Sequence, residues 1–144
     1  MRRLLATVLM LWFGTTHAAL VSHHGYTLDT ETNIVTGGGL EWLQWDVTLG
    51  DSVNTALGNH AANGWRVATN TEMSTLLNAF PFGMVFDDIE STQQTISLAS
   101  EGDKAAEFIA LFGETQLSSP TNKRSQATYG TDLNANGYIN HTYI

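Results

Sequence analysis

The side chains best arranged to bind an ion lie near the end of the chain, where oxygen-bearing residues alternate with others. The run reads Asp132-Leu-Asn134-Ala-Asn136-Gly137-Tyr138-Ile139-Asn140. Calcium-binding loops take oxygen ligands from alternate positions of such a run, and they need a glycine at the sixth position for the sharp turn. The pattern therefore indicates Asp132, Asn134, Asn136 and Tyr138 as candidate calcium ligands.

A tight turn that joins two strands is the alternative, and we favour it. A calcium loop of this type closes with a bidentate acidic side chain, but this chain has Tyr143 at that position. The pair Asn136-Gly137 is in turn a strong signal for a β-hairpin. Apart from this calcium ion, the sequence predicts no cofactor. Titration calorimetry with millimolar calcium is the test, and an absence of heat would end the calcium hypothesis.

The sequence signals for catalytic residues are weaker than those for calcium ligands. Asp87, Asp88 and Glu90 form an acidic cluster that could help to hold a cation, although such clusters are usually solvated loops. The chain has no G-x-S-x-G, H-E-x-x-H, Walker or G-x-G-x-x-G motif. Its acids offer many pairs for acid–base chemistry, but no pair is singled out. The sequence therefore predicts a protein that is not an enzyme.

The charge balance excludes two broad classes of protein. The 144 residues include 14 acidic and 6 basic side chains, for a formal net charge of −8, and no cysteine. Proteins that bind nucleic acids need a basic surface, and disulfide scaffolds need cysteine. Charged residues make up 14% of the chain, where about 25% is usual. Neutral polar side chains must therefore cover much of the surface.

The first eighteen residues have the pattern of a cleavable signal peptide. Arg2 and Arg3 precede an uncharged apolar run over residues 4–14, and a small residue, Ala18, ends the segment. A membrane anchor is the alternative, but the run falls short of the about 20 residues that a bilayer core requires. We expect a secreted bacterial protein, extracellular or periplasmic, whose mature chain has no membrane span. Removing the signal leaves 4 basic and 14 acidic residues, so 4 − 14 gives −10.

Helices and short strands alternate in a way that predicts one α+β domain over residues 19–144. Apolar residues at helical spacing predict three amphipathic helices, each with one buried face. Their stripes are Val53, Ala56, Leu57 and His60; Met73, Leu76, Leu77 and Phe80; and Ala105, Phe108, Ile109 and Phe112. Asp51 or Ser52 should cap the first helix, and Thr69 with Glu72 should form a capping box on the second. Gly113 is a natural end for the third.

Runs of β-forming residues predict short, mainly antiparallel strands on which these helices pack. The runs cover residues 25–35 as a pair with a turn near 29–33, then 40–45, 64–69, 115–118, 126–129 and 138–144. Within 40–45, strand alternation places Trp42 on one face and Trp45 on the other, so both faces should be buried. Trp65 is expected in the core beside Trp42. The pair His23-His24 should lie at the frayed start of the mature chain.

Two short motifs resemble those of a known group of proteins. They are Gly39-Leu40-Glu41-Trp42-Leu43 and, about twenty residues later, Gly64-Trp65-Arg66-Val67-Ala68-Thr69-Asn70-Thr71-Glu72. This signature resembles exported bacterial proteins that carry a C-terminal PEP-CTERM sorting tail. It is similar, more distantly, to the Lcl C-terminal domain family. The second resemblance implies a C-type-lectin-like fold and binding of extracellular glycans or surfaces.

The sequence therefore predicts a secreted or cell-surface, non-catalytic domain that binds an extracellular glycan or matrix component. Arg66 and Trp45 are the candidate ligand-binding residues. For Arg66, a structural ion pair with Glu41 or Glu72 is the favoured alternative. A different hypothesis is an exported hydrolase that uses two facing carboxylates. A third is a fragment of a longer envelope-sorted protein, because the sorting tail typical of the group does not follow Ile144.

Overall fold

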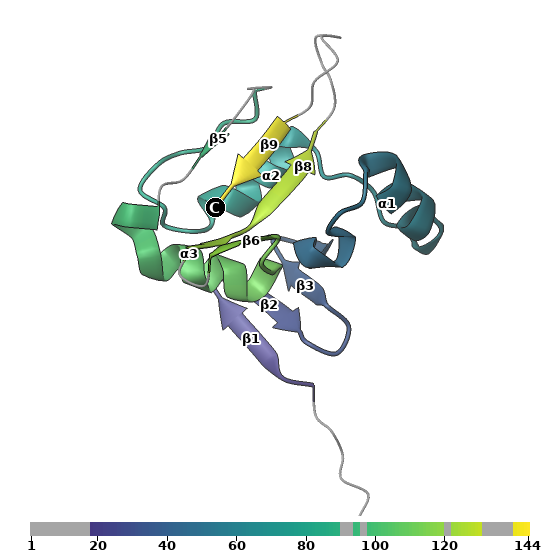
Figure 1. Ribbon diagram of the computed structural model, residues 1–144, viewed down its shortest axis with the longest axis horizontal. Coiled ribbons are helices and arrows are strands. Elements are labelled where there is room, and N and C mark those ends of the chain that lie inside the picture. Colours follow the sequence, from purple (N-terminus) through teal and green to yellow (C-terminus); the bar gives the residue numbers. More distant parts are fainter. Residues whose placement is uncertain (1–17, 90–93, 96–97, 120–121, 131–139) are drawn as a thin grey trace, which may run out of the picture.

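The first four strands form an antiparallel sheet in which each strand pairs with its neighbour in sequence (Figure 1). The computed structural model describes residues 18–89, 94–95, 98–119, 122–130 and 140–144. The strands are β1 (Leu20–His23), β2 (Tyr26–Asp29), β3 (Ile34–Gly37) and β4 (Leu40–Leu43). Gly38 and Gly39 have φ angles of 62° and 77°, which a two-residue hairpin requires. The pair predicted over residues 25–35 is confirmed as β2 and β3, whereas β1 is additional.

Three α-helices follow the sheet, and all three were predicted from their apolar spacing. They are α1 (Val53–His60), α2 (Asn70–Asn78) and α3 (Leu98–Phe112), and the 3₁₀ helices η1 (Trp45–Thr48) and η2 (Ala61–Asn63) flank α1. Ser52 caps α1 by accepting a hydrogen bond from the backbone N–H of Thr55 at 3.1 Å. The predicted capping box of Thr69 and Glu72 opens α2. These caps satisfy N–H groups that have no helical partner, so they fix where the helices begin.

The C-terminal strands form two smaller sheets. In one, β9 (Asn140–Tyr143) lies between β8 (Gln126–Tyr129), which is antiparallel to it, and β5 (Gln94–Thr95), which is parallel. In the other, β6 (Gln116–Ser119) pairs antiparallel with β7 (Asn122–Arg124). The three strands predicted after the third helix correspond to β6, β8 and β9. Since helices and mainly antiparallel strands occupy separate parts of the chain, the fold is α+β.

An aromatic cluster joins the first sheet to the last two helices. The rings of Phe108 and Phe112 on α3 stack with centroids 4.5 Å apart, and Phe80 packs edge-on against Phe108 at 4.9 Å. Tyr26 of β2, Trp45 of η1 and Phe82 also belong to the cluster. Aromatic side chains bury large apolar areas, so this cluster is the main source of core stability. In contrast, α1 has no buried residue and stands apart from the other helices in Figure 1.

The predicted positions of Trp45 and Trp65 were wrong. The strand ends at Leu43, and η1 turns the chain back so that Trp45 enters the same core as Trp42. Trp45 is 9% exposed, with its ring 5.1 Å from that of Phe108. Glu41 is exposed, so β4 is buried on one face only. Trp65 was expected in the core but is only partly buried.

Two local expectations were also wrong. Residues 64–69 form no strand. The N–H of Gly130, which directly follows β8, donates a hydrogen bond to the carbonyl of Ala68 at 2.8 Å. His23 and His24 are not frayed, because both side chains reach Glu107 on α3. His24 Nε2 lies 2.7 Å from Glu107 Oε2, and its ring packs edge-on against Phe80 at 5.0 Å. This contact fastens the β1–β2 turn to α3.

Within the described residues, no helix has both the length and the apolar composition that crossing a membrane requires. The longest helix, α3, runs over Leu98–Phe112 and uses its apolar face in the aromatic cluster.

Candidate ligand-binding groove

A groove of about 790 Å³ lies between α1 and the free edges of the two larger sheets. Its walls are β4 and η1 on one side and α1 with η2 on another. The extended residues 64–68 and parts of β8 and β9 complete it. Small-molecule sites in proteins are concavities of about 300–1,000 Å³ with apolar walls and a few polar groups. The groove therefore has the size and position of a ligand site.

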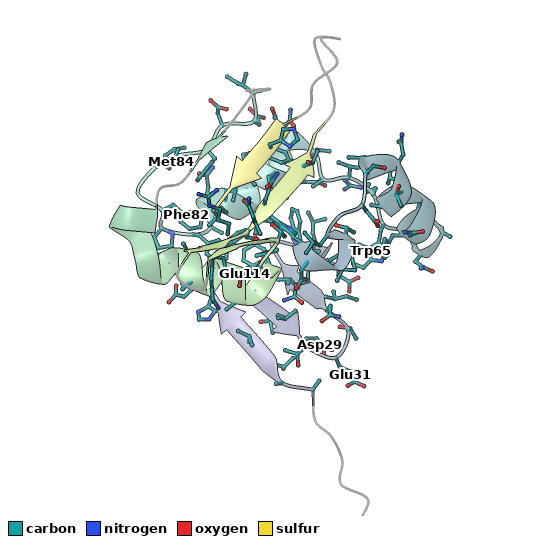
Figure 2. All side chains as sticks on the ribbon, viewed as in Figure 1. Asp29, Glu31, Trp65, Phe82, Met84 and Glu114 are labelled. Atoms are coloured by element: carbon teal, nitrogen blue, oxygen red, sulfur yellow. The ribbon has the colours of Figure 1, made fainter. Side chains whose placement is uncertain are left out.

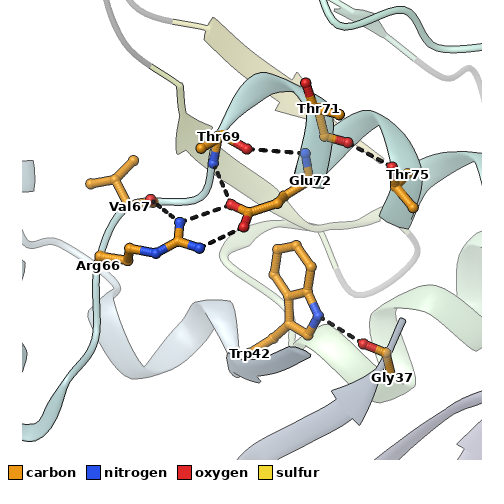
Figure 3. A network of polar contacts seen from close by, with 8 residues as sticks. All are labelled: Gly37, Trp42, Arg66, Val67, Thr69, Thr71, Glu72 and Thr75. Atoms are coloured by element: carbon orange, nitrogen blue, oxygen red, sulfur yellow. Dashed lines mark hydrogen bonds and ion pairs between the residues drawn. The ribbon is translucent and has the colours of Figure 1, made fainter. Parts of the chain in front are cut away.

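Three tryptophans line this groove, and they differ in how they are held. Trp42 and Trp45 are 8% and 9% exposed and belong to the core, so the groove receives only part of each ring. The indole of Trp42 also donates to the carbonyl of Gly37 at 3.4 Å (Figure 3). Trp65 lies beside α1 (Figure 2) and is only partly buried. Trp65 is thus the indole that offers the most surface to a ligand.

The apolar stripe of α1 faces the groove instead of the core. Val53, Ala56, Leu57 and His60 all line it, and all four are partly buried. A helix in a globular protein ordinarily buries its apolar stripe against the core. In this protein, the apolar stripe of α1 instead forms one wall of the open groove.

Main-chain groups on the outer edge of β4 have no strand partner in the part of the chain that the structure describes. Gln44 N–H donates to the carbonyl of Asn33. Hydrogen-bonded positions alternate along an antiparallel pair, so the main-chain N–H and C=O of Trp42 also point toward β3. Glu41 and Leu43 therefore direct their N–H and C=O groups away from β3, at the outer edge of the sheet. Both residues line the groove. They supply donors and acceptors that a polar ligand can use.

The rim of the groove carries the ion pair that the sequence predicted as an alternative to ligand contact. Arg66 Nη1 and Nη2 donate to the two carboxylate oxygens of Glu72, at 2.8 and 2.5 Å (Figure 3). Glu72 Oε2 also accepts from the backbone N–H of Thr69 at 2.8 Å. The Arg66 side chain is 58% exposed, against 22% for Glu72. The partner of Arg66 is thus Glu72 and not Glu41.

These hydrogen bonds hold Glu72 in its ionised form. Bonding to Arg66, and then to the backbone N–H of Thr69, lowers the pKa of the Glu72 carboxyl from 4.5 to about 2. A carboxylate that accepts several charge-assisted or backbone bonds is stabilised as the anion. At neutral pH both side chains are therefore charged and bonded to each other, and the net charge of the pair is zero. The Arg66 guanidinium lies at the rim of the groove.

Two histidines add polar atoms to the groove. His141 on β9 contacts the hydroxyl of Thr128 on β8, with Nδ1 and Oγ1 separated by 3.0 Å. His60 ends α1 and is partly buried, as expected for a packing residue. All three residues line the groove. Together they bring hydrogen-bonding groups from α1, β8 and β9 to one concavity.

The structure does not describe the predicted calcium ligands. Asp132, Asn134, Asn136 and Tyr138 fall outside the described residues, so calcium binding stays a prediction. The strands that flank them, β8 and β9, pair antiparallel, with Tyr129 opposite Asn140. Among the residues that the structure describes, no group of three or more histidine or acidic side chains could hold a metal ion.

The acidic cluster after α2 contributes to local structure. Asp88 accepts a hydrogen bond from the hydroxyl of Thr71 at 3.1 Å, and Asp87 accepts from the backbone N–H of Ile89 at 3.3 Å. Glu90 lies outside the described residues. Neither Asp87 nor Asp88 lines the groove.

Sequence reasoning proposed two of the residues that line the groove, Arg66 and Trp45, as ligand-binding residues, but it did not predict that α1 forms a wall of a groove. The one available signal was the composition of the α1 stripe. Its small and weakly apolar residues, Ala56 and His60 among them, bury less area than the leucines and phenylalanines of α2 and α3.

Comparison with protein-family models, with curated proteins and with solved structures finds no match to this chain. The resemblances to the PEP-CTERM group and to the Lcl C-terminal domain family, with the C-type-lectin-like fold that the second implies, therefore stay predictions that rest on the two sequence motifs.

Proposed function

We propose that the protein is an exported, non-catalytic domain that binds an extracellular glycan in the groove between α1 and β4. The observation that carries this proposal is the exposed part of Trp65 in a concavity that also holds the outer-edge main-chain groups of Glu41 and Leu43. A sugar ring presents an apolar face that packs on an indole and hydroxyls that need donors and acceptors. The groove offers an indole face and main-chain donors and acceptors in one concavity.

The state of Glu72 supports a binding role over hydrolysis. A hydrolase that uses two carboxylates needs one of them to carry a proton near neutral pH. Glu72 lines the groove, but its pKa of about 2 keeps it ionised there. Its two oxygens are engaged by Arg66. Glu72 is therefore unsuited to act as the general acid.

Export is the second part of the proposal, and it rests on the signal-like residues 1–18. We expect cleavage after Ala18 when the full chain is expressed in a bacterium. Recovery of a mature protein from the periplasm or medium, with Ala19 as its N-terminal residue by mass spectrometry, is the expected result. Retention of the complete chain in the cytoplasm would contradict it.

The glycan hypothesis is tested on a glycan array with a matched pair of variants. Trp65→Ala removes the indole of the groove, while Met84→Ala removes an apolar side chain that is 44% exposed on the opposite side of the view in Figure 2. We expect Trp65→Ala to weaken binding about tenfold or more, because tryptophan is enriched among binding residues whose truncation costs about 2 kcal/mol or more. Met84→Ala should bind as the wild type does. An array without any binder, or equal binding by Trp65→Ala, contradicts the proposal.

A further inference from the structure

We infer that the groove selects glycans by charge: it accepts neutral and amino-bearing sugars and rejects those that carry carboxylate or sulfate groups. This inference rests on the proposed function and names the ligand class within it. It comes from the charged side chains that the fold gathers around the groove, and from how they are paired.

The charged groups of the groove sum to a negative value. Among the described residues that line the groove, the acids are Glu41, Asp51 and Glu72, and Arg66 is the one lysine or arginine. Their formal charges give +1 − 3 = −2. Arg66 and Glu72 neutralise each other through two hydrogen bonds. The excess negative charge therefore belongs to Glu41 on β4 and Asp51 before α1.

The two excess acids come from different elements that line the groove, so a bound ligand lies near both of them. Glu41 is exposed on the edge strand β4, and Asp51 is exposed just before the N-cap of α1. Asp51 Oδ2 accepts one hydrogen bond, from the amide of Asn59 at 3.4 Å. A neutral amide leaves its charge in place, so the carboxylate still repels an anion.

The N-terminus of α1 is the other positive feature of this region, and it is already occupied. Backbone N–H groups at a helix start attract anions. In this protein the hydroxyl of Ser52 accepts from the N–H of Thr55, and Asp51 precedes it in the chain. The start of α1 is therefore already capped by the protein's own Ser52 hydroxyl and offers little to an acidic ligand.

The net charge of the protein acts in the same direction. The chain carries −8 overall, and charges within about 8 Å interact through physiological salt. At low ionic strength, two carboxylates about 7 Å from an anionic group of the ligand weaken its binding roughly tenfold in water, and physiological salt reduces this to about twofold. The same two carboxylates strengthen the binding of a protonated amine by a similar factor, and 1 M salt removes most of either effect.

The experiment uses matched sugars that differ only in charge. An array carries β-1,4 oligomers of glucose, galactose and mannose, each as the neutral form, as an amino form quaternised so that its positive charge does not depend on pH, and as the uronate form. It is read at low ionic strength and at pH 8, where histidines are ordinarily neutral. We expect each uronate form to bind about tenfold more weakly than its neutral form, and each amino form at least as tightly as the neutral form. Raising the salt to 1 M should bring the three forms together.

Two variants locate the effect in the groove. The double variant Glu41→Gln with Asp51→Asn should bring the uronate and neutral forms within about twofold of each other. Glu31→Gln is the matched control, since it removes a carboxylate from the exposed β2–β3 turn outside the groove (Figure 2). It should retain the tenfold discrimination. Loss of discrimination in both variants would assign it to net charge and overturn the inference.

The outcomes separate the inference from the proposed function. Uronate forms that bind as tightly as their neutral forms overturn the charge selectivity and leave glycan binding in place. Binding to no member of the array overturns both. Discrimination that survives in the double variant also overturns the inference, because it would arise outside Glu41 and Asp51.

Discussion

Replacement of Glu72 by glutamine tests how much stability comes from its charge. Glutamine keeps a side-chain oxygen that can accept from the N–H of Thr69, as glutamine does in many capping boxes. The variant therefore preserves the start of α2 and removes the ionic part of the contact with Arg66. Glu72 receives bonds from both residues in the native protein.

The magnitude follows from the pKa and the exposure of the pair. A fall in the carboxyl pKa from 4.5 to about 2 corresponds to at most about 3 kcal/mol of stability at neutral pH. Arg66 is 58% exposed, and exposed ion pairs contribute about 0.2–1 kcal/mol because solvent screens them. We expect Glu72→Gln to lower the free energy of unfolding by about 1 kcal/mol at pH 7.

The pH dependence carries the sign of a lowered carboxyl pKa. The charge of Glu72 stabilises the folded state fully above pH 4.5, and this contribution is lost as the pH falls toward 2. Wild type should therefore lose more stability than Glu72→Gln on acidification. The difference between the two proteins should shrink at pH 3 to less than half its value at pH 7.

Urea denaturation followed by tryptophan fluorescence, repeated from pH 3 to pH 7, measures this difference. Glu31→Gln is the control for loss of a carboxylate, because Glu31 is exposed in the β2–β3 turn. It should differ from wild type by less than about 0.5 kcal/mol. A constant difference between wild type and Glu72→Gln across the pH range would refute the reasoning, since it would show that the charge is not what stabilises the pair.

Three further predictions concern packing, and denaturant melts check each of them. Trp45→Ala should lower the free energy of unfolding by about 3–5 kcal/mol, whereas Trp65→Ala should cost less than about 1 kcal/mol, and equal losses would contradict the different burial of the two rings. Gly37→Ala should cost about 1–3 kcal/mol, because its Cβ would lie 2.6 Å from Cγ of Tyr26; a neutral effect would contradict this close approach. His24→Ala should cost about 1 kcal/mol by removing an edge contact with an aromatic ring, and an unchanged melt would show that the β1–β2 turn is not fastened to α3.

The helices were predictable because their signals are local. The Thr69–Glu72 box and the stripe of α2 lie within a dozen residues, and the N-cap Ser52 directly precedes its helix. Short-range hydrogen bonds and apolar spacing decide such elements whatever the rest of the chain does. The α+β class followed from them, together with strand runs at both ends.

The placement of the tryptophans was not predictable by the same means. The prediction extended the alternation of side chains along the strand from Trp42 to Trp45. The strand ends between them, and η1 changes the direction of the Trp45 side chain. A single-turn helix leaves no periodic signal in so few residues. The error exchanged the roles of Trp45 and Trp65, so the core indole was named as a ligand residue and the groove indole as core.

The groove itself depends on contacts that no local pattern encodes. Glu41 on β4, Leu57 on α1 and Thr128 on β8 line one concavity although they are far apart in the sequence. The contact between His24 and Glu107 likewise spans 83 positions. Single-sequence reasoning could identify the polar and aromatic groups but not which of them share a surface.

The order of the first sheet has a consequence for how the protein is made. Strands β1 to β4 pair only with sequence neighbours, and such local contacts form early in folding. Apolar side chains of this sheet, Leu28 of β2 among them, are covered in part by α3, which begins at Leu98. During synthesis and translocation the N-terminal hairpins therefore emerge before the helix that shields them. We expect the nascent chain to need a holding chaperone until α3 has left the ribosome, and an isolated segment that stops before Leu98 to aggregate.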